Sequence, residues 1–178
     1  MTSIDWLIIF VGIGVVVFFT IAGLMRSLFS AVTLWAVTLL SAVSYGEVAF
    51  RLQAIGGENV TMFRGIVFDG LLVIFFVVGI ILVKVAFPDT KLPKIGILDN
   101  LVGLLVGVII AVVLVSLLTN SLGVMVSERW VTNENGWASL RGQYYASGLR
   151  PYTTQVIGVY RWLFAPFFRG LPPVLFPQ

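Results

Sequence analysis

Residues 98–122 read LDNLVGLLVGVIIAVVLVSLLTNSL, and this stretch decides the fold class. Asp99 is its only charged residue, so the stretch offers little for water to solvate. A helix needs about 20 mostly apolar residues to cross the hydrocarbon core of a bilayer. Three further stretches meet that requirement, namely residues 6–24, 28–45 and 66–86. We therefore expect an all-α membrane protein with four transmembrane helices in two antiparallel hairpins.

The composition of the whole chain also favours a bilayer. Its 178 residues are 59% hydrophobic and 11% charged, whereas soluble domains are about 45–50% apolar and about 25% charged. The chain has no Cys and no His, which removes disulfides, the commonest zinc ligands and the usual general base. We predict a non-catalytic protein without a cofactor or a metal. The net charge of +3 is scattered, so we expect contact with lipid and not with nucleic acid.

The chain is predicted to have two parts. Residues 1–123 form the transmembrane domain, and residues 124–178 form an aromatic-rich tail without an uncharged stretch long enough to span. Pro151 can open a helix, and apolar side chains recur at helical spacing from Tyr152 to Phe164. This pattern predicts a short amphipathic C-terminal helix that is interfacial, lying among the lipid headgroups. The alternative is a helix packed back onto the ends of the bundle.

The connections between the spans differ in length. Residues 25–27 predict a short turn between the first two spans, which forces an antiparallel hairpin. Residues 46–65 are the candidate for a re-entrant or surface segment. Residues 88–94 hold two prolines and two lysines, which indicates a break between helices.

Basic residues predict the orientation of the chain. With four spans, both termini lie on one side, and the two short connections on the other side carry Arg26, Lys84, Lys91 and Lys94. The preference of basic residues for the cytoplasm is strongest in short loops. The charge density therefore favours these connections inside the cell and both termini outside it. The raw count of basic residues does not give that answer, because the arginines of the tail lie on the other side.

Four charged residues are candidates for an ion pair or a polar site: Arg26, Asp99, Asp5 and Lys84. Asp99 begins the fourth span, where the helix macrodipole stabilises a carboxylate by about 0.3–1 kcal/mol. Arg26 is either an interfacial cation or the partner of Asp99, for which Lys84 competes. Asp69 is expected at the membrane interface, with a water-filled cavity as the alternative.

Small residues predict the helix contacts. Gly103 and Gly107 share one face of the fourth span, where a Gly-x-x-x-Gly spacing lets another helix approach closely. Gly23 belongs to the same predicted set. The second span carries hydroxyl residues near one face, namely Ser30, Thr33, Thr38, Ser41 and Ser44. These favour helix contact, and a polar permeation path is the alternative.

The layout resembles the CvpA (colicin V production) family of bacterial inner-membrane proteins over roughly residues 4–165. The matching features are an Ile4-Asp5 start, Gly23 and Arg26 at the end of the first span, the Asp-x-x-x-Gly-x-x-x-Gly pattern of Asp99, Gly103 and Gly107, and a tail segment from Ser147 to Pro151 followed by Arg161-Trp162.

The chain departs from the family pattern at three places. The Arg-Gly that follows the second glycine falls on Ile110-Ala111, and the glycine after the first-span arginine is Ser27. The acidic residue early in the second span is missing, with Ala31 nearby. The chain therefore resembles a divergent member of this family, and the missing charges favour a mainly structural role.

The resemblance implies a place in the bacterial cytoplasmic membrane and support for toxin (bacteriocin) production or export, or for envelope homeostasis. Some relatives carry an extracytoplasmic protease domain after the four-helix unit, which agrees with an outside C-terminus. Two other interpretations stay open. One is a structural or assembly subunit of a larger membrane complex, and the other is a small oligomeric channel or transporter. The expected partners are the lipid bilayer and other membrane subunits or a second copy.

Overall fold

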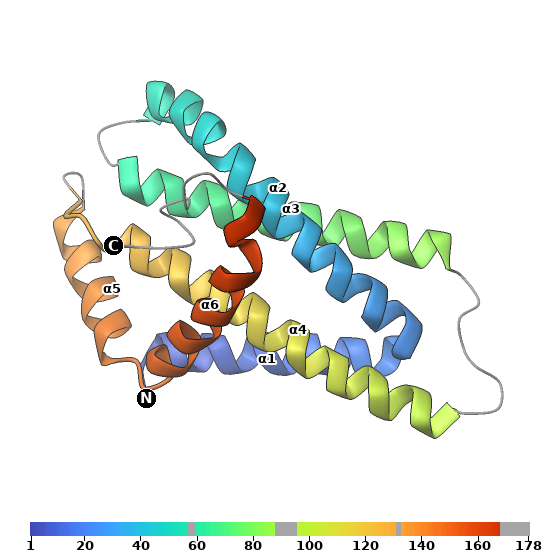
Figure 1. Cartoon of the computed structure of the whole chain (residues 1–178). Coiled ribbons are helices and arrows are strands. Elements are labelled where there is room, and N and C mark those ends of the chain that lie inside the picture. Colours follow the sequence, from blue (N-terminus) through green and yellow to red (C-terminus); the bar gives the residue numbers. More distant parts are fainter. Residues whose placement is uncertain (57–59, 88–95, 131–132, 168–178) are drawn as a thin grey trace.

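The computed structural model describes residues 1–56, 60–87, 96–130 and 133–167. Across these ranges the chain is built from helices (Figure 1). They are α1 (Ser3–Ala22), α2 (Leu24–Gly56), α3 (Val60–Ala86), α4 (Gly96–Met125), α5 (Glu134–Ala146) and α6 (Arg150–Phe164), followed by a 3₁₀ turn at Ala165–Phe167. The predicted all-α fold class is confirmed.

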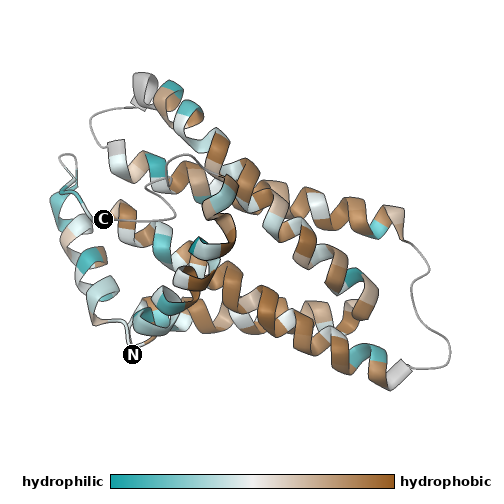
Figure 2. Ribbon diagram, viewed as in Figure 1, coloured by the Kyte–Doolittle hydropathy of each residue, from teal (hydrophilic) through white to brown (hydrophobic). Residues whose placement is uncertain are grey.

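Four of the helices are long and apolar enough to cross a membrane. Their spans are Ser3–Ala22, Leu24–Leu52, Thr61–Ala86 and Leu98–Met125. Most residues of each span lie at the surface of the bundle, and the ribbon is predominantly hydrophobic along these helices (Figure 2). Lipid chains solvate such a surface and water does not. The protein is a multi-pass membrane protein.

The break between α1 and α2 lies at Gly23, and not at residues 25–27 as predicted. Gly23 has φ +82° and ψ 174°, a conformation that is nearly restricted to glycine. Its N–H still donates to the carbonyl of Phe19 over 3.2 Å. One residue therefore turns the chain, and residues 25–27 are already helical.

The connection between α2 and α3 is much shorter than residues 46–65. α2 continues to Gly56 and α3 begins at Val60, so most of the predicted re-entrant or surface segment is helical. The Glu47 and Arg51 side chains form an i,i+4 ion pair of 2.8 Å on this extension. The residues of this extension are less apolar than the rest of α2, although the helix itself continues. The predicted break at residues 88–94 lies outside the described residues.

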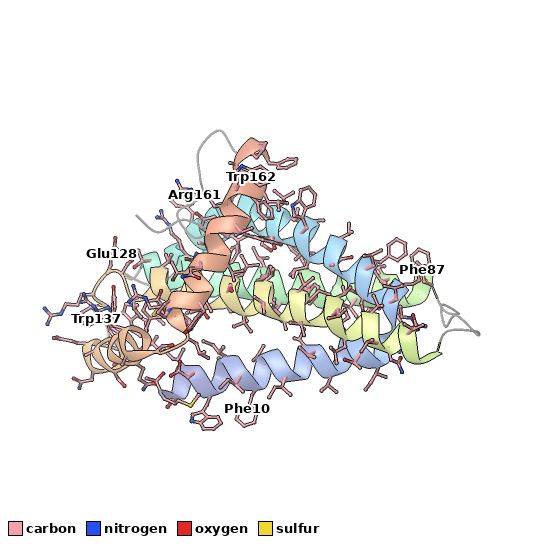
Figure 3. The ribbon with its side chains drawn as sticks, turned by 60° about the horizontal axis from the view of Figure 1, so that its bottom comes forward. Phe10, Phe87, Glu128, Trp137, Arg161 and Trp162 are labelled. Carbon is pink, nitrogen blue, oxygen red and sulfur yellow. The ribbon has the colours of Figure 1, made fainter. Side chains whose placement is uncertain are left out.

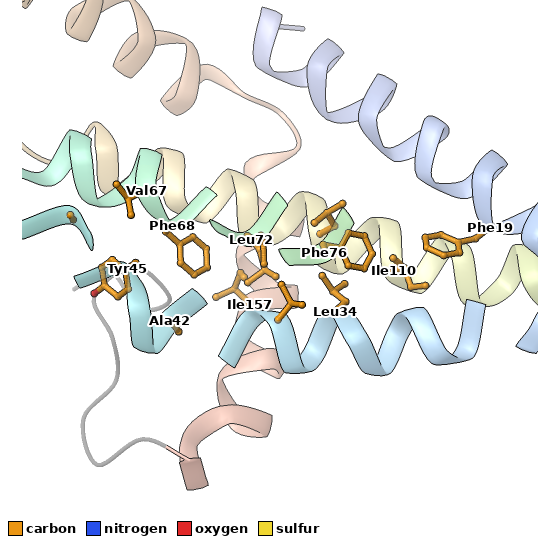
Figure 4. Packing of buried hydrophobic residues seen from close by; sticks show 14 residues of the cluster. Phe19, Leu34, Ala42, Tyr45, Val67, Phe68, Leu72, Phe76, Ile110 and Ile157 are labelled. Carbon is orange, nitrogen blue, oxygen red and sulfur yellow. The ribbon is translucent and has the colours of Figure 1, made fainter. Parts of the chain in front are cut away.

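The most extensive contacts among the four spans are between α1 and α4 and between α2 and α3. α1 packs along α4, α2 packs along α3, and α2 also contacts α4. Phe68, Leu72 and Phe76 of α3 fill the main core (Figure 4), and each is at most 5% exposed. Phe19 of α1 and Ile110 of α4 join them, each 1% exposed. The centre of the bundle is therefore apolar and closely filled.

The tail begins with α5, a helix that the sequence did not predict. α5 lies at the end of the bundle where the N-terminus lies (Figure 1). Arg141 stacks over Trp137, 4.7 Å from the ring centroid, and Arg150 stacks over Tyr145 at 4.5 Å. Cations on aromatic rings suit the headgroup region, where apolar and polar surroundings meet.

The amphipathic helix of the tail is α6, and Pro151 lies in its first turn as predicted. Its inner face packs onto α4, and Ile157 belongs to the main core. Phe164 stacks on Trp35 of α2 at 5.8 Å. Because Trp35 lies well inside α2, α6 reaches along the flank of the bundle and does not stop at its end.

Tyr160 also lies on the inner side of α6. Burial raises the pKa of its phenol to about 12, while its hydrogen bond with Thr38 acts in the opposite direction. The outer side carries Trp162, which is 80% exposed and points away from the bundle (Figure 3). The tail thus shares the core of residues 1–123 on one side and presents aromatic side chains on the other.

Candidate functional site

Asp99 joins three helices at the end of the bundle where α1 meets α2. Its carboxylate accepts a hydrogen bond from the backbone N–H of Leu24, 2.9 Å away, and is only 6% exposed. Leu24 is the first residue of α2, so Asp99 satisfies one of the N–H groups that a helix start leaves unpaired. A Cβ atom at Gly23 would collide with the same carboxylate. Asp99 therefore holds the α1–α2 junction against α4.

The two glycines after Asp99 let α1 approach α4. A Cβ atom at Gly103 would lie 2.9 Å from the Phe19 carbonyl oxygen and 3.2 Å from the Cα of Gly23. A Cβ atom at Gly107 would lie 2.9 Å from the Cβ of Phe19. Gly23, Gly103 and Gly107 thus lie in one contact between α1 and α4. The Gly-x-x-x-Gly spacing here brings two backbones together, as such spacings do in membranes.

Several hydroxyl side chains at the start and middle of α2 are buried between helices. Ser27 donates to the carbonyls of Gly23 (2.7 Å) and Phe19 (3.1 Å), and Thr38 donates to Leu34 (2.7 Å). Ser30 and Ser41 are at most 1% exposed. These small side chains lie inside the bundle among apolar ones, which favours the helix-contact interpretation of this face.

Arg26 and Lys84 meet at one pocket, beside the α1–α2 junction. The Nε and Nη2 atoms of Arg26 donate to the carbonyl oxygen of Phe87, each over 3.3 Å. Arg26 and Lys84 both line a pocket of about 200 Å³ between α1, α2 and α3. Asp99 accepts from the Leu24 N–H, whereas Arg26 donates to the Phe87 carbonyl. The Arg26–Asp99 ion pair stays a prediction.

Asp5 fixes the opposite end of the bundle. Its carboxylate and the Thr2 hydroxyl form a capping box at the start of α1, with a 2.8 Å bond from the Thr2 N–H. The other carboxylate oxygen accepts from the Ser147 hydroxyl at 2.5 Å and from the Leu149 N–H at 3.3 Å. Asp5 is 1% exposed. It therefore ties the segment between α5 and α6 to the start of α1.

Asp69 is half-buried at the contact between α3 and α4. Its carboxylate accepts a 2.6 Å hydrogen bond from Ser121 of α4, and it lies within the span of α3. The sequence did not identify Ser121 or Ser147 as partners, because a serine in an apolar run carries no sign of its distant neighbour. Ser147 did lie in a tail segment that resembles the family. No three His, Cys, Asp or Glu side chains gather to hold a metal within the described ranges.

Residues 4–155 match the family model described as colicin V production protein. The chain belongs to the colicin V production protein family. The match begins at the Ile4-Asp5 start, includes Gly103 and Gly107 of α4, and extends through the first turn of α6. No curated protein and no solved structure matches the chain.

The family match extends beyond the four spans into the tail. Asp5 and Ser147 lie near the two ends of the family match, and the Ser147 hydroxyl donates a hydrogen bond to Asp5. Ile110 and Ala111, where the chain departs from the pattern that it resembles, are 1% and 4% exposed. Apolar side chains at these buried positions leave no charge that would require a partner in the core.

Proposed function

We propose that this colicin V production family protein supports the production or export of a secreted toxin from the bacterial cytoplasmic membrane, and that it does so without catalysis. The family match over residues 4–155 carries the proposal. The non-catalytic part of the proposal is supported by Asp5 and Asp99, because both of these buried carboxylates hold helix ends together. The absence of His and Cys from the sequence leaves no common nucleophile–base pair. The protein would therefore act by binding partners.

The test is deletion of the gene in a toxin-secreting host, followed by measurement of toxin inside and outside the cells. We expect extracellular toxin to fall and to return when the wild-type protein is supplied. Gly107→Leu should not restore it, because the side chain would separate α1 from α4. Gly14→Leu is the matched control, since no atom lies within 4 Å of a Cβ at Gly14. Unchanged toxin levels after deletion would refute the proposal.

A second candidate function is that of an assembly subunit in a larger membrane complex. The outer face of α6 favours it, because Tyr152, Val159 and Trp162 are 66–80% exposed outside the four spans. Native mass analysis in a mild detergent tests this candidate. Other polypeptides in fixed ratio would support it, and a lone protein or homo-oligomer would count against it.

A further inference from the structure

The pocket beside Arg26 combines charge and apolar surface at one end of the bundle. Arg26, Ser30 and Lys84 form its polar side, and Phe18, Ile21 and Val83 are among its apolar lining. Arg26 and Ser30 lie one turn apart on α2, and Lys84 lies in the last turn of α3. Among the described residues, no carboxylate lines the pocket. Two cations therefore share one recess with a hydroxyl and an apolar wall.

The surroundings of this pocket favour an anion that carries apolar chains. Phe18 and Ile21 are 50% and 71% exposed on the lipid-facing side of α1, so an occupant would also contact acyl chains. Phe29 stacks on Phe87 at 4.3 Å next to the carbonyl that holds Arg26. A volume of about 200 Å³ exceeds the roughly 150 Å³ of a cavity that holds benzene. A phosphate with its first attached carbons is of similar size.

Asp99 is the carboxylate that the structure describes near this end, and it does not line the pocket. The carboxylate of Asp99 faces the Leu24 N–H and the turn at Gly23. Lys84 makes no hydrogen bond or ion pair with the described part of the chain. A basic recess between transmembrane helices at a membrane surface is a common site for anionic lipid headgroups.

We propose that this pocket binds the phosphate of an anionic phospholipid in the leaflet beside the α1–α2 and α3–α4 connections. Lys84 provides the mobile charge, and Arg26, held by the Phe87 carbonyl, provides a fixed one. Ser30 lies beside them as a hydroxyl donor. The apolar lining receives the start of the acyl chains. This binding does not depend on the toxin-related function and would persist if that function were wrong.

The test uses the full-length protein in vesicles with equal amounts of phosphatidylglycerol and phosphatidylcholine. After mild extraction, native mass spectrometry counts the lipids that stay bound. We expect phosphatidylglycerol to be retained preferentially by the wild type and by Lys84→Arg. Lys84→Gln should lower its retention about fivefold, the factor that corresponds to about 1 kcal/mol per basic side chain near a membrane. Arg64 is an exposed arginine near the other end of α3, and Arg64→Gln should leave the retention of phosphatidylglycerol unchanged.

Three outcomes would overturn the proposal. The wild type could retain both lipids equally, or Lys84→Gln could retain as much phosphatidylglycerol as Arg64→Gln. Inorganic phosphate at the same concentration could displace the lipid, which would indicate a site for a free anion. Thermal unfolding of each variant in detergent verifies that it is folded, and Lys84 is exposed, so its replacement leaves the core intact.

Discussion

Two buried aspartates, one at each end of the bundle, hold the starts of helices in place. Asp99 caps the start of α2 next to the positive φ of Gly23, and Asp5 caps the start of α1 and binds Ser147. Both carboxylates meet backbone N–H groups, which is the partner that a helix start offers. The sequence identified both aspartates as polar candidates. It could not identify their partners, because these lie 75 and 142 residues away along the chain.

Gly23→Ala should destabilise the protein by about 1–3 kcal/mol, the cost of forcing a side chain into a conformation that glycine tolerates. The new Cβ would also displace the carboxylate of Asp99 from the Leu24 N–H. Thermal unfolding in detergent measures the effect. Gly14→Ala, on the open side of α1, is the control and should unfold like the wild type. Equal unfolding temperatures for both variants would contradict the role of the turn.

Ser147→Ala should loosen the tail while leaving the capping box at Thr2 and Asp5 intact. A hydrogen bond to a charged group contributes about 1.5–3 kcal/mol, and this one joins the tail to α1 over 2.5 Å. Tryptic cleavage in the tail at Arg141, which is followed by Gly142, should become faster. Ser139→Ala is the control, because Ser139 is exposed on α5. If both variants are cut at the wild-type rate, Asp5 does not hold the tail through Ser147.

At the scale of elements, the sequence predicts the four apolar helices well. It predicts the less apolar helical segments, the end of α2 and α5, poorly. The four spans and α6 were predicted because twenty apolar residues or a helical spacing of aromatics is a strong signal. The end of α2 beyond Tyr45 was predicted as a connection, since hydropathy reports burial in lipid and not helicity. α5 was missed because its apolar residues are few, and the ones that pack, Leu140 and Tyr144, do so against residues far along the chain.

Ile157→Ala should test whether α6 is part of the core. Ile157 is 7% exposed in the main cluster, so its truncation leaves a cavity that costs about 2–5 kcal/mol. The unfolding temperature should fall by several degrees. Val159→Ala removes a side chain that is 66% exposed on the outer face and should have little effect. A larger effect at Val159 than at Ile157 would mean that the helix is packed the other way round.

At the scale of the whole molecule, the fold places both ends of the transmembrane domain on one side. Asp5 near the start of α1 and Ser147 after α5 are in contact, which requires an even number of crossings between them. The opposite side holds Arg26 and Lys84 in or beside short connections, and positive charge in short loops favours the cytoplasm. We propose that the tail is extracytoplasmic and that the pocket at Lys84 faces the cytoplasmic leaflet.

Labelling of single cysteines in intact cells tests this arrangement most directly, because the natural chain has no Cys. Glu128→Cys lies after α4 on the side of the tail, and Asn100→Cys lies near the start of α4 on the other side. Both positions are exposed. A membrane-impermeant maleimide should label Glu128→Cys in intact cells, and should label Asn100→Cys only after the membrane is opened. Labelling of Asn100→Cys alone in intact cells would reverse the orientation, and labelling of both would contradict the four-span bundle itself.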